Sequence, residues 1–139
     1  MTRLDIPIDL FKCGIVFYCG DRHAMRRTLA ADGLLVSDSD FGDIGSSVGA
    51  VLDIVDEPDK ILWLAALDLP VLVHEAVHAA KRILDEKGVS DEETLCYLVE
   101  HIVRVIFSSR FASRLSLSSD ATSHKTAKQS ARSLHRARF

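Results

Sequence analysis

Residues 71–103 of this 139-residue chain, VLVHEAVHAAKRILDEKGVSDEETLCYLVEHIV, decide the fold of its second half. Asp68 and Pro70 stand before this stretch in positions typical of a helix start, where the missing N–H of proline has no helical partner to lose. Gly88 is a favourable residue just beyond a helix end. The first part of the stretch therefore predicts a helix from about residue 68 to residue 87.

A second helix is predicted directly after this one. Ser90 and Glu93 have the spacing of a capping box, in which each side chain bonds the backbone of the other residue. Apolar residues then recur at helical spacing as far as Phe107. They are Leu95, Leu98, Val99, Ile102, Val105 and Ile106.

The residues before position 68 predict strands and one short helix. The run Cys13–Cys19 is β-branched and aromatic, and Asp21 can cap a helix over 22–31. A serine-, aspartate- and glycine-rich loop is expected over 37–47, where a calcium site is disfavoured because the pattern lacks a correctly placed glycine and glutamate. The apolar runs 48–55 and 60–66 flank a short turn and predict a β-hairpin. The expected fold class is α+β with a small antiparallel sheet.

The chemistry-bearing motif is His74-Glu75-Ala76-Val77-His78. On a helix, residues four apart lie on the same face, so both imidazoles can reach one metal ion. Zinc binds histidine nitrogen and in hydrolytic sites keeps an open position beside three protein ligands. Glu75 borders that position and can take a proton from an activated water molecule. The residues thus predict a Zn²⁺ site with Glu75 as general base.

Composition allows an estimate of how often such a motif arises by chance. With six histidines and six glutamates in the chain, about 0.01 accidental HExxH motifs are expected. The alternative interpretation is that His74 and His78 are two unrelated histidines on a solvated helix face. The position of the motif, inside a strong helix after a hairpin, favours the metal site.

Residues 48–107, and the segment 71–103 above all, resemble the zincin metallopeptidases, in particular small gluzincin-like proteins of tailed phages. The resemblance implies a minimal zincin-like domain with the HExxH helix, a following antiparallel helix, and a strand along a substrate cleft. It also implies a third zinc ligand from a glutamate on the next helix, within a Glu-x-x-Ala-Tyr type of pattern. Here the matching residues are Glu93-Thr94-Leu95-Cys96-Tyr97, with Cys96 in the small-residue position.

Two glutamates remain candidates for the third ligand. The resemblance implies Glu93, although Glu93 is also the expected capping-box residue. If the two helices form a tight hairpin centred near Val89, the residue opposite His78 is instead Glu100. Both alternatives stay open, with Glu93 preferred on the pattern.

Other polar residues near the motif have a functional and a plain interpretation. Tyr97 lies four residues after Glu93 and is a candidate to stabilise an oxyanion, against ordinary packing at a helix interface. His101 is a candidate outer ligand or proton donor, but is better explained, like His23, as a partly exposed histidine. Cys96 is interpreted as a small core residue, because no base is placed to activate its thiol.

The net charge of −3 combines two unlike parts of the chain. Residues 1–108 hold 10 Lys and Arg against 19 Asp and Glu, a balance of −9, whereas residues 109–139 hold seven against one, a balance of +6. This predicts a zincin-like domain over 1–108 and a basic Ser/Arg-rich tail over 109–139. Through residues 110–138 the tail can solubilise the chain, dock on an acidic partner, or make weak contacts with nucleic acid.

Several classes of protein are excluded by composition. A hydrophobic content of 47% excludes a wholly disordered chain, and no apolar run is long enough for a membrane span. The N-terminus lacks the apolar core of a signal peptide, and three cysteines in no close pair fit a reducing compartment. The expected location is the cytoplasm of a bacterial host cell or a virion.

Two functions are therefore expected from different classes. The first is a zinc-dependent metallopeptidase that hydrolyses a peptide or protein substrate. The second is a zincin-fold structural or interaction protein of a phage particle, whose basic tail docks on phage structural proteins or nucleic acid. The short chain leaves little material for a substrate cleft, which favours the second more than the motif alone does.

Overall fold

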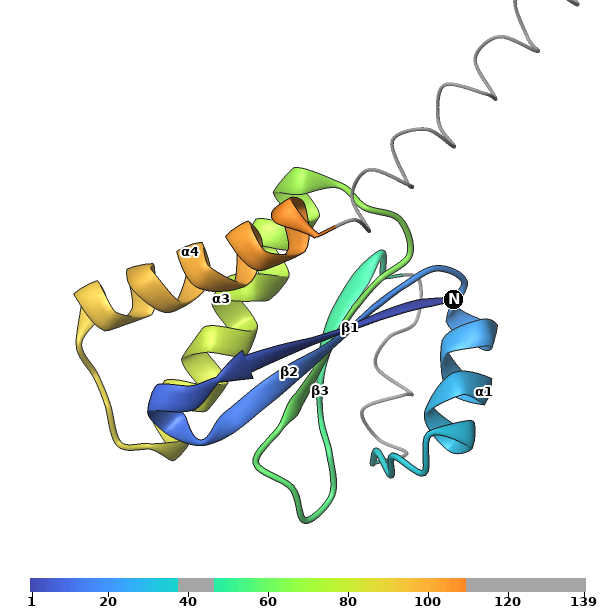
Figure 1. Ribbon diagram of the computed structural model, residues 1–139, viewed down its shortest axis with the longest axis horizontal. Coiled ribbons are helices and arrows are strands. Elements are labelled where there is room, and N and C mark those ends of the chain that lie inside the picture. The colour runs from blue at the N-terminus through green and yellow to red at the C-terminus, as the bar shows by residue number, and fades with distance from the viewer. Residues whose placement is uncertain (38–46, 110–139) are drawn as a thin grey trace, which may run out of the picture. The chain divides into compact units, whose positions relative to one another are not determined.

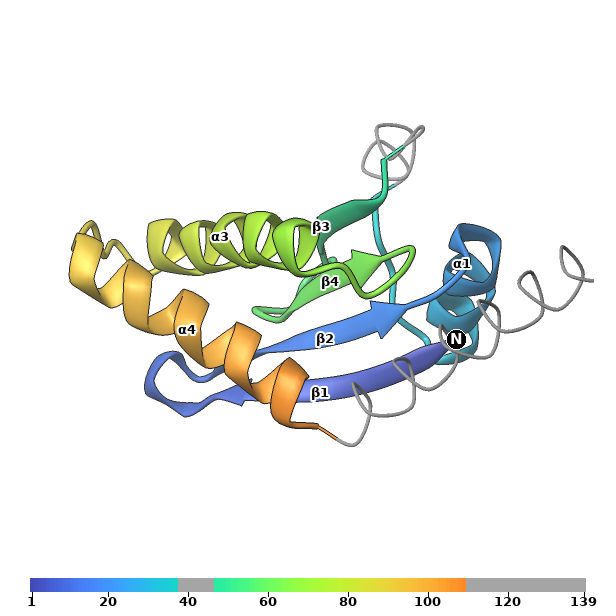
Figure 2. The same cartoon turned by 90° about the horizontal axis from the view of Figure 1, so that it is seen from above.

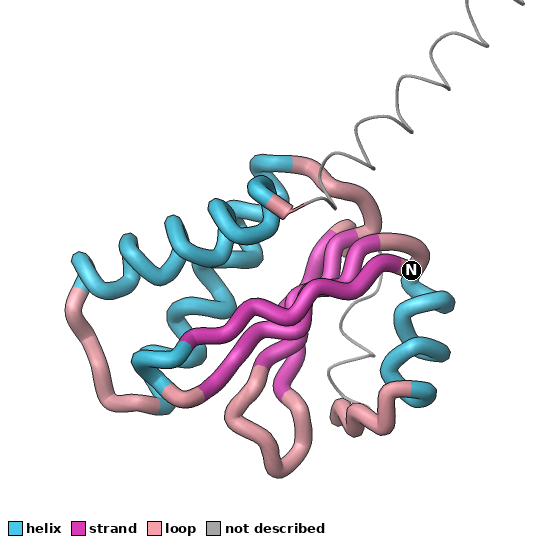
Figure 3. Tube along the Cα trace, viewed as in Figure 1, coloured by secondary structure: helices cyan, strands magenta, loops and turns pink. Residues whose placement is uncertain are grey.

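The computed structural model describes residues 1–37 and 47–109 and has an α+β fold, as predicted (Figure 3). The chain separates into two units, Met1–Ile106 and Phe107–Phe139. The predicted loop, apart from its ends, and the basic tail, apart from Ser109, lie outside the described residues. The elements in chain order are β1 (Thr2–Ile8), the 3-10 helix η1 (Asp9–Phe11), β2 (Cys13–Cys19), α1 (Arg22–Ala31), β3 (Gly49–Asp53), β4 (Lys60–Leu64), α3 (Leu69–Glu86) and α4 (Glu92–Ser108).

The four strands form one mixed sheet in the order β1-β2-β4-β3. The predicted hairpin is confirmed, with β3 antiparallel to β4, and β1 is antiparallel to β2. The two pairs meet where β2 lies parallel to β4, with Ile15 opposite Lys60 and Cys19 opposite Leu64. The expectation of an antiparallel sheet is therefore wrong at this central pairing. Because α1 and β3 intervene between β2 and β4, the chain has the length needed for a parallel crossover.

Strand β1 is an element that the sequence pattern did not reveal. Its residues TRLDIPI include an acid and a proline, both of which are uncommon in strands. An edge position accommodates them, because only one side of β1 pairs with a neighbour. Ile6 and Ile8 are buried, whereas the residues between and before them are mostly exposed.

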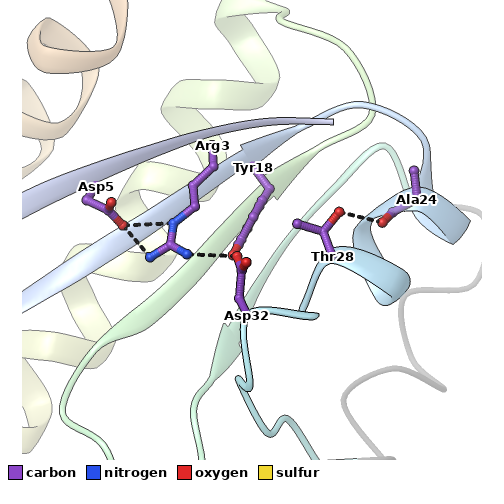
Figure 4. Close-up of polar contacts among 6 residues, drawn as sticks. All are labelled: Arg3, Asp5, Tyr18, Ala24, Thr28 and Asp32. Atoms are coloured by element: carbon purple, nitrogen blue, oxygen red, sulfur yellow. Dashed lines mark hydrogen bonds and ion pairs between the residues drawn. The ribbon is translucent and has the colours of Figure 1, made fainter. Parts of the chain in front are cut away.

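Helix α1 covers one face of the sheet through Met25 and Leu29. These residues belong to a buried cluster with alternate residues of the strands, Val16, Tyr18, Leu52, Ile54, Ile61 and Trp63. Asp21 caps the helix by accepting a hydrogen bond from the N–H of Ala24, as predicted. At its other end the Tyr18 hydroxyl donates to Asp32, and Arg3 bridges Asp5 and Asp32 (Figure 4). The Tyr18 hydrogen bond is the main reason why the pKa of Asp32 is lowered.

Helices α3 and α4 lie on the side of the sheet away from α1 (Figure 1). Helix α3 begins where predicted, with Asp68 accepting from the N–H of Val71, and ends before Gly88, whose φ is 68°. It packs over β3 and β4 through buried small and aliphatic residues, namely Leu72, Ala76, Ala79, Ala80, Ile83 and Leu84. The long helix is thus fixed against the β-hairpin that precedes it.

The start of α4 differs from the predicted capping box. The cap is Asp91, whose carboxylate accepts hydrogen bonds from the N–H and hydroxyl of Thr94, and the helix begins at Glu92. These bonds lower the pKa of Asp91. Leu98, Ile102 and Ile106 are buried, as the apolar spacing predicted. Figure 2 shows α4 returning in roughly the opposite direction to α3 but crossing it obliquely.

Candidate metal and hydrolytic site

The two histidines of the HExxH motif converge on consecutive turns of α3. Their Nε2 atoms lie 3.1 Å apart and their ring centroids 4.6 Å apart, with the rings edge to face. This contact is a hydrogen bond in which one ring nitrogen donates and the other accepts, with the roles set by the tautomers. The predicted helical placement of both rings on one face is therefore present in the structure.

This separation fits two ligands of a single zinc ion. Zinc–nitrogen bonds of about 2.0–2.1 Å in a tetrahedron place neighbouring nitrogens about 3.3 Å apart. The observed distance of 3.1 Å is slightly shorter than that value, and a rotation of a few degrees about a side-chain bond would remove the difference. The donor set, two neutral imidazole nitrogens, is also one that zinc prefers.

Both histidines lie on the exposed side of α3. By the 3.6-residue period they are about half a turn away from Ala76, which is fully buried. Solvent and solutes therefore reach the Nε2 pair without a rearrangement of the core.

Glu75 points from the neighbouring side of the same helix toward the sheet. It is half-buried and shares a pocket of about 400 Å³ with His74. The other lining residues come from the start of β3 and the first turn of α3, namely Ser47, Val48, Gly49, Pro70 and Val71. The Glu75 side chain thus lies against the start of the edge strand β3, in a pocket that it shares with His74.

A cluster of charges fixes α3 on the hairpin at the other end of β3. The Lys60 ammonium, 2% exposed, lies 2.7 Å from Glu86 Oε1 and 3.4 Å from Asp53 Oδ1. Arg82 Nη1 lies 3.0 Å from Asp53 Oδ2. Because Asp53 and Gly49 are four residues apart on one face of β3, α3 meets this strand at two points, through this cluster at Asp53 and through Glu75 at Gly49.

Neither candidate for the third ligand joins the histidine pair in the part of the chain that the structure describes, where no group of three or more His, Cys, Asp or Glu is placed to hold a metal. Glu93 is exposed and accepts a hydrogen bond of 3.2 Å from Tyr97. Glu100 is exposed and lies 3.7 Å from Arg104. The choice between these glutamates remains a prediction.

Tyr97 and His101 lie in a different pocket from that of Glu75. This pocket, about 330 Å³, is formed between η1 and α4, and Leu10 and Phe11 line its other side. His101 Nε2 lies 3.3 Å from the carbonyl oxygen of Pro7, an ordinary contact between helix α4 and strand β1. Tyr97 is 63% exposed, more than ordinary packing at a helix interface would leave, and its hydroxyl donates a hydrogen bond to Glu93.

The cysteines are free thiols. Burial raises the pKa of Cys13 and of Cys19, which makes both poor nucleophiles. Cys96, predicted to be a small core residue, is exposed on α4. That prediction was wrong because Cys96 falls outside the stripe of Leu98 and Ile102 that α4 buries.

Gly49 is the residue of this site that the sequence analysis missed. Its only signal was a glycine at the start of a strand pattern, which often marks a close approach of another element. The element that approaches is α3, through Glu75 and Val71.

Comparisons with known proteins identify no relative. No protein-family model matches the chain, and neither the curated proteins nor the solved structures contain a significant match. The helices within the described ranges include none long and apolar enough to cross a membrane.

Proposed function

We propose that this protein is a zinc-dependent metallopeptidase in which His74 and His78 hold the metal and Glu75 is the general base. The observation that carries the proposal is the 3.1 Å separation of the two Nε2 atoms, together with the pocket that Glu75 shares with His74. The resemblance of residues 48–107 to the zincins supports the same assignment, and it makes Glu93 the preferred third ligand over Glu100.

The chain's own residues account for the other requirements of peptide hydrolysis. When bound, zinc supplies a Lewis acid that polarises a carbonyl and makes water more acidic. The Glu75 carboxylate, which shares a pocket with His74, would accept the proton of the attacking water and return it to the leaving amine. Strand β3 is an edge strand, and an extended peptide can add to such an edge by main-chain hydrogen bonds. The substrate class is therefore an extended peptide or protein segment.

The test is a peptidase assay on the full chain loaded with zinc, using a mixed peptide library as substrate. We expect Glu75→Gln to reduce cleavage by at least 100-fold while zinc binding and the thermal midpoint stay unchanged. Glu92→Gln, an exposed glutamate at the start of α4, is the matched control and should cleave like the parent. Cleavage that persists in Glu75→Gln would contradict the proposed role of Glu75.

Two observations favour a second function. Both histidines are exposed, and the described residues bring no third ligand to them. In this alternative the protein is a zincin-fold structural or interaction protein of a phage particle, and its basic tail contacts a partner or nucleic acid. Zinc binding without any cleavage of the library would favour this alternative over the peptidase.

A further inference from the structure

Gly49 has a close contact with the general base that no other residue type would allow. A Cβ atom at this position would lie 2.8 Å from Glu75 Cγ, 2.8 Å from Leu64 Cδ2 and 3.0 Å from Val71 Cγ1. Non-bonded carbons are ordinarily about 3.5–4.0 Å apart, so each of the three contacts must be relieved if a side chain is added.

Of the three neighbours, Leu64 is the least able to move. Its side chain is fully buried in the face of the sheet that α3 covers. Displacing it would force a rearrangement of close-packed core residues. Val71 is β-branched and lies in the first turn of α3, where few rotamers are open to it.

The C-terminal half of the helix is also tied to the β-hairpin by ion pairs. Arg82 and Glu86 hold its C-terminal half through Asp53 and the buried Lys60, at 3.0 Å and 2.7 Å. Of the three side chains that must give way to a side chain at position 49, the half-buried Glu75 is the one freest to rotate. Because Cγ lies between the backbone and the carboxylate, such a rotation displaces the carboxylate from the neighbourhood of His74.

We propose that Gly49 is a positioning residue, which places the Glu75 carboxylate for catalysis by leaving the face of β3 open to the Glu75 side chain. The inference rests on the proposed function for its catalytic consequence, but the contact itself is independent of activity. A displacement of about 1 Å of a catalytic group is enough to reduce turnover by about 100-fold.

The experiment compares the full chain with Gly49→Ala and with Gly14→Ala. Gly14 is the matched control, because it is also a strand glycine and its added Cβ would meet only a backbone oxygen at 3.2 Å and the side chain of Asp59. For Gly49→Ala we expect kcat to fall 10- to 100-fold, with KM and zinc stoichiometry within twofold of the parent, and a crystal structure showing a rotated Glu75. Gly14→Ala should keep the parental kcat.

Two results would overturn the inference, namely a parental kcat in Gly49→Ala or a crystal structure of that variant with Glu75 unmoved. If the parent itself cleaves no peptide, the proposed function fails, whereas the position of Glu75 in the variant's structure still decides the role of Gly49. If Gly49→Ala does not fold, Gly49→Ala/Leu64→Val removes the 2.8 Å contact with Leu64 Cδ2 and carries the same measurements.

Discussion

His74 Nε2 and His78 Nε2 lie 3.1 Å apart on the exposed face of α3. Two nitrogens at this distance either share a proton or share a metal ion. The proposed function depends on a shared metal ion, and Glu75, which lies against Gly49 of β3, shares a pocket with His74.

Removing one histidine should abolish zinc binding. We expect His78→Ala to reduce zinc affinity by more than 100-fold, because it removes one of the two imidazole ligands and leaves only His74 and the proposed glutamate. His23→Ala, which changes an exposed histidine on α1, is the control and should bind zinc like the parent. Titration calorimetry with zinc measures both. Equal affinity of His78→Ala and the parent would contradict the metal assignment.

The third ligand can be identified by the two glutamate variants. We expect Glu93→Gln to weaken zinc binding about 10-fold or more and Glu100→Gln to leave it unchanged, because the resemblance to the zincins implies Glu93. A zinc-dependent loss of the 3.2 Å Tyr97–Glu93 hydrogen bond would accompany binding, and NMR of the Tyr97 ring detects it. The opposite ranking of the two variants would assign the ligand to Glu100.

Because Lys60 is buried, removing its acidic partners should lower the stability more than removing Lys60 itself. The double variant Asp53→Asn/Glu86→Gln leaves the Lys60 ammonium without a carboxylate, and it should lower the free energy of unfolding by about 2 to 3 kcal/mol. This loss is smaller than that for a fully buried ion pair, because both acids are half exposed. Lys60→Met removes the charge together with the need for partners and should cost less than about 1 kcal/mol. Urea denaturation measures both, and equal losses would contradict this account.

The predictions from sequence succeeded where the signal is local. The strand Cys13–Cys19 and the caps at Asp21 and Asp68 follow from short patterns, and the structure has all three. The placement of His74 and His78 on one helix face follows from the helical period alone. Local patterns therefore gave the helix that carries the motif and the hairpin before it.

The features that the sequence did not yield depend on pairing between distant residues. Strand β1 is stabilised by β2 rather than by its own composition, and the parallel pairing of β2 with β4 has no local signature. At the start of α4, Ser90 and Asp91 were both suitable caps, and only the hydrogen bonds to Thr94 distinguish them. The closeness of Glu75 to Gly49 likewise results from how α3 packs on β3.

The cap of α4 can be tested directly. We expect Asp91→Ala to lower the thermal midpoint and Ser90→Ala to leave it unchanged, because the Asp91 carboxylate satisfies backbone N–H groups of the first turn. Circular dichroism during heating measures both variants. A loss confined to Ser90→Ala would restore the capping box.

The Tyr18–Asp32 hydrogen bond predicts a dependence of stability on pH. The pKa of Asp32 is lower in the folded state than in the unfolded state, where it is about 3.9. The ionised carboxylate therefore stabilises the fold fully above the unfolded-state pKa, and this stabilisation is lost as the pH falls through the folded-state pKa. Tyr18→Phe should raise the pKa of Asp32, measured by NMR of the carboxyl carbon. The stability difference between the parent and the variant should narrow below about pH 4. An unchanged Asp32 pKa would contradict this prediction.

The most direct test of the central claim is a crystal structure of the zinc-loaded full chain with an anomalous difference map at the zinc edge. The account predicts one peak about 2.0–2.1 Å from Nε2 of both His74 and His78, with a glutamate as a further ligand. A map without a peak between the two histidines, with their nitrogens still hydrogen-bonded to each other, would contradict it.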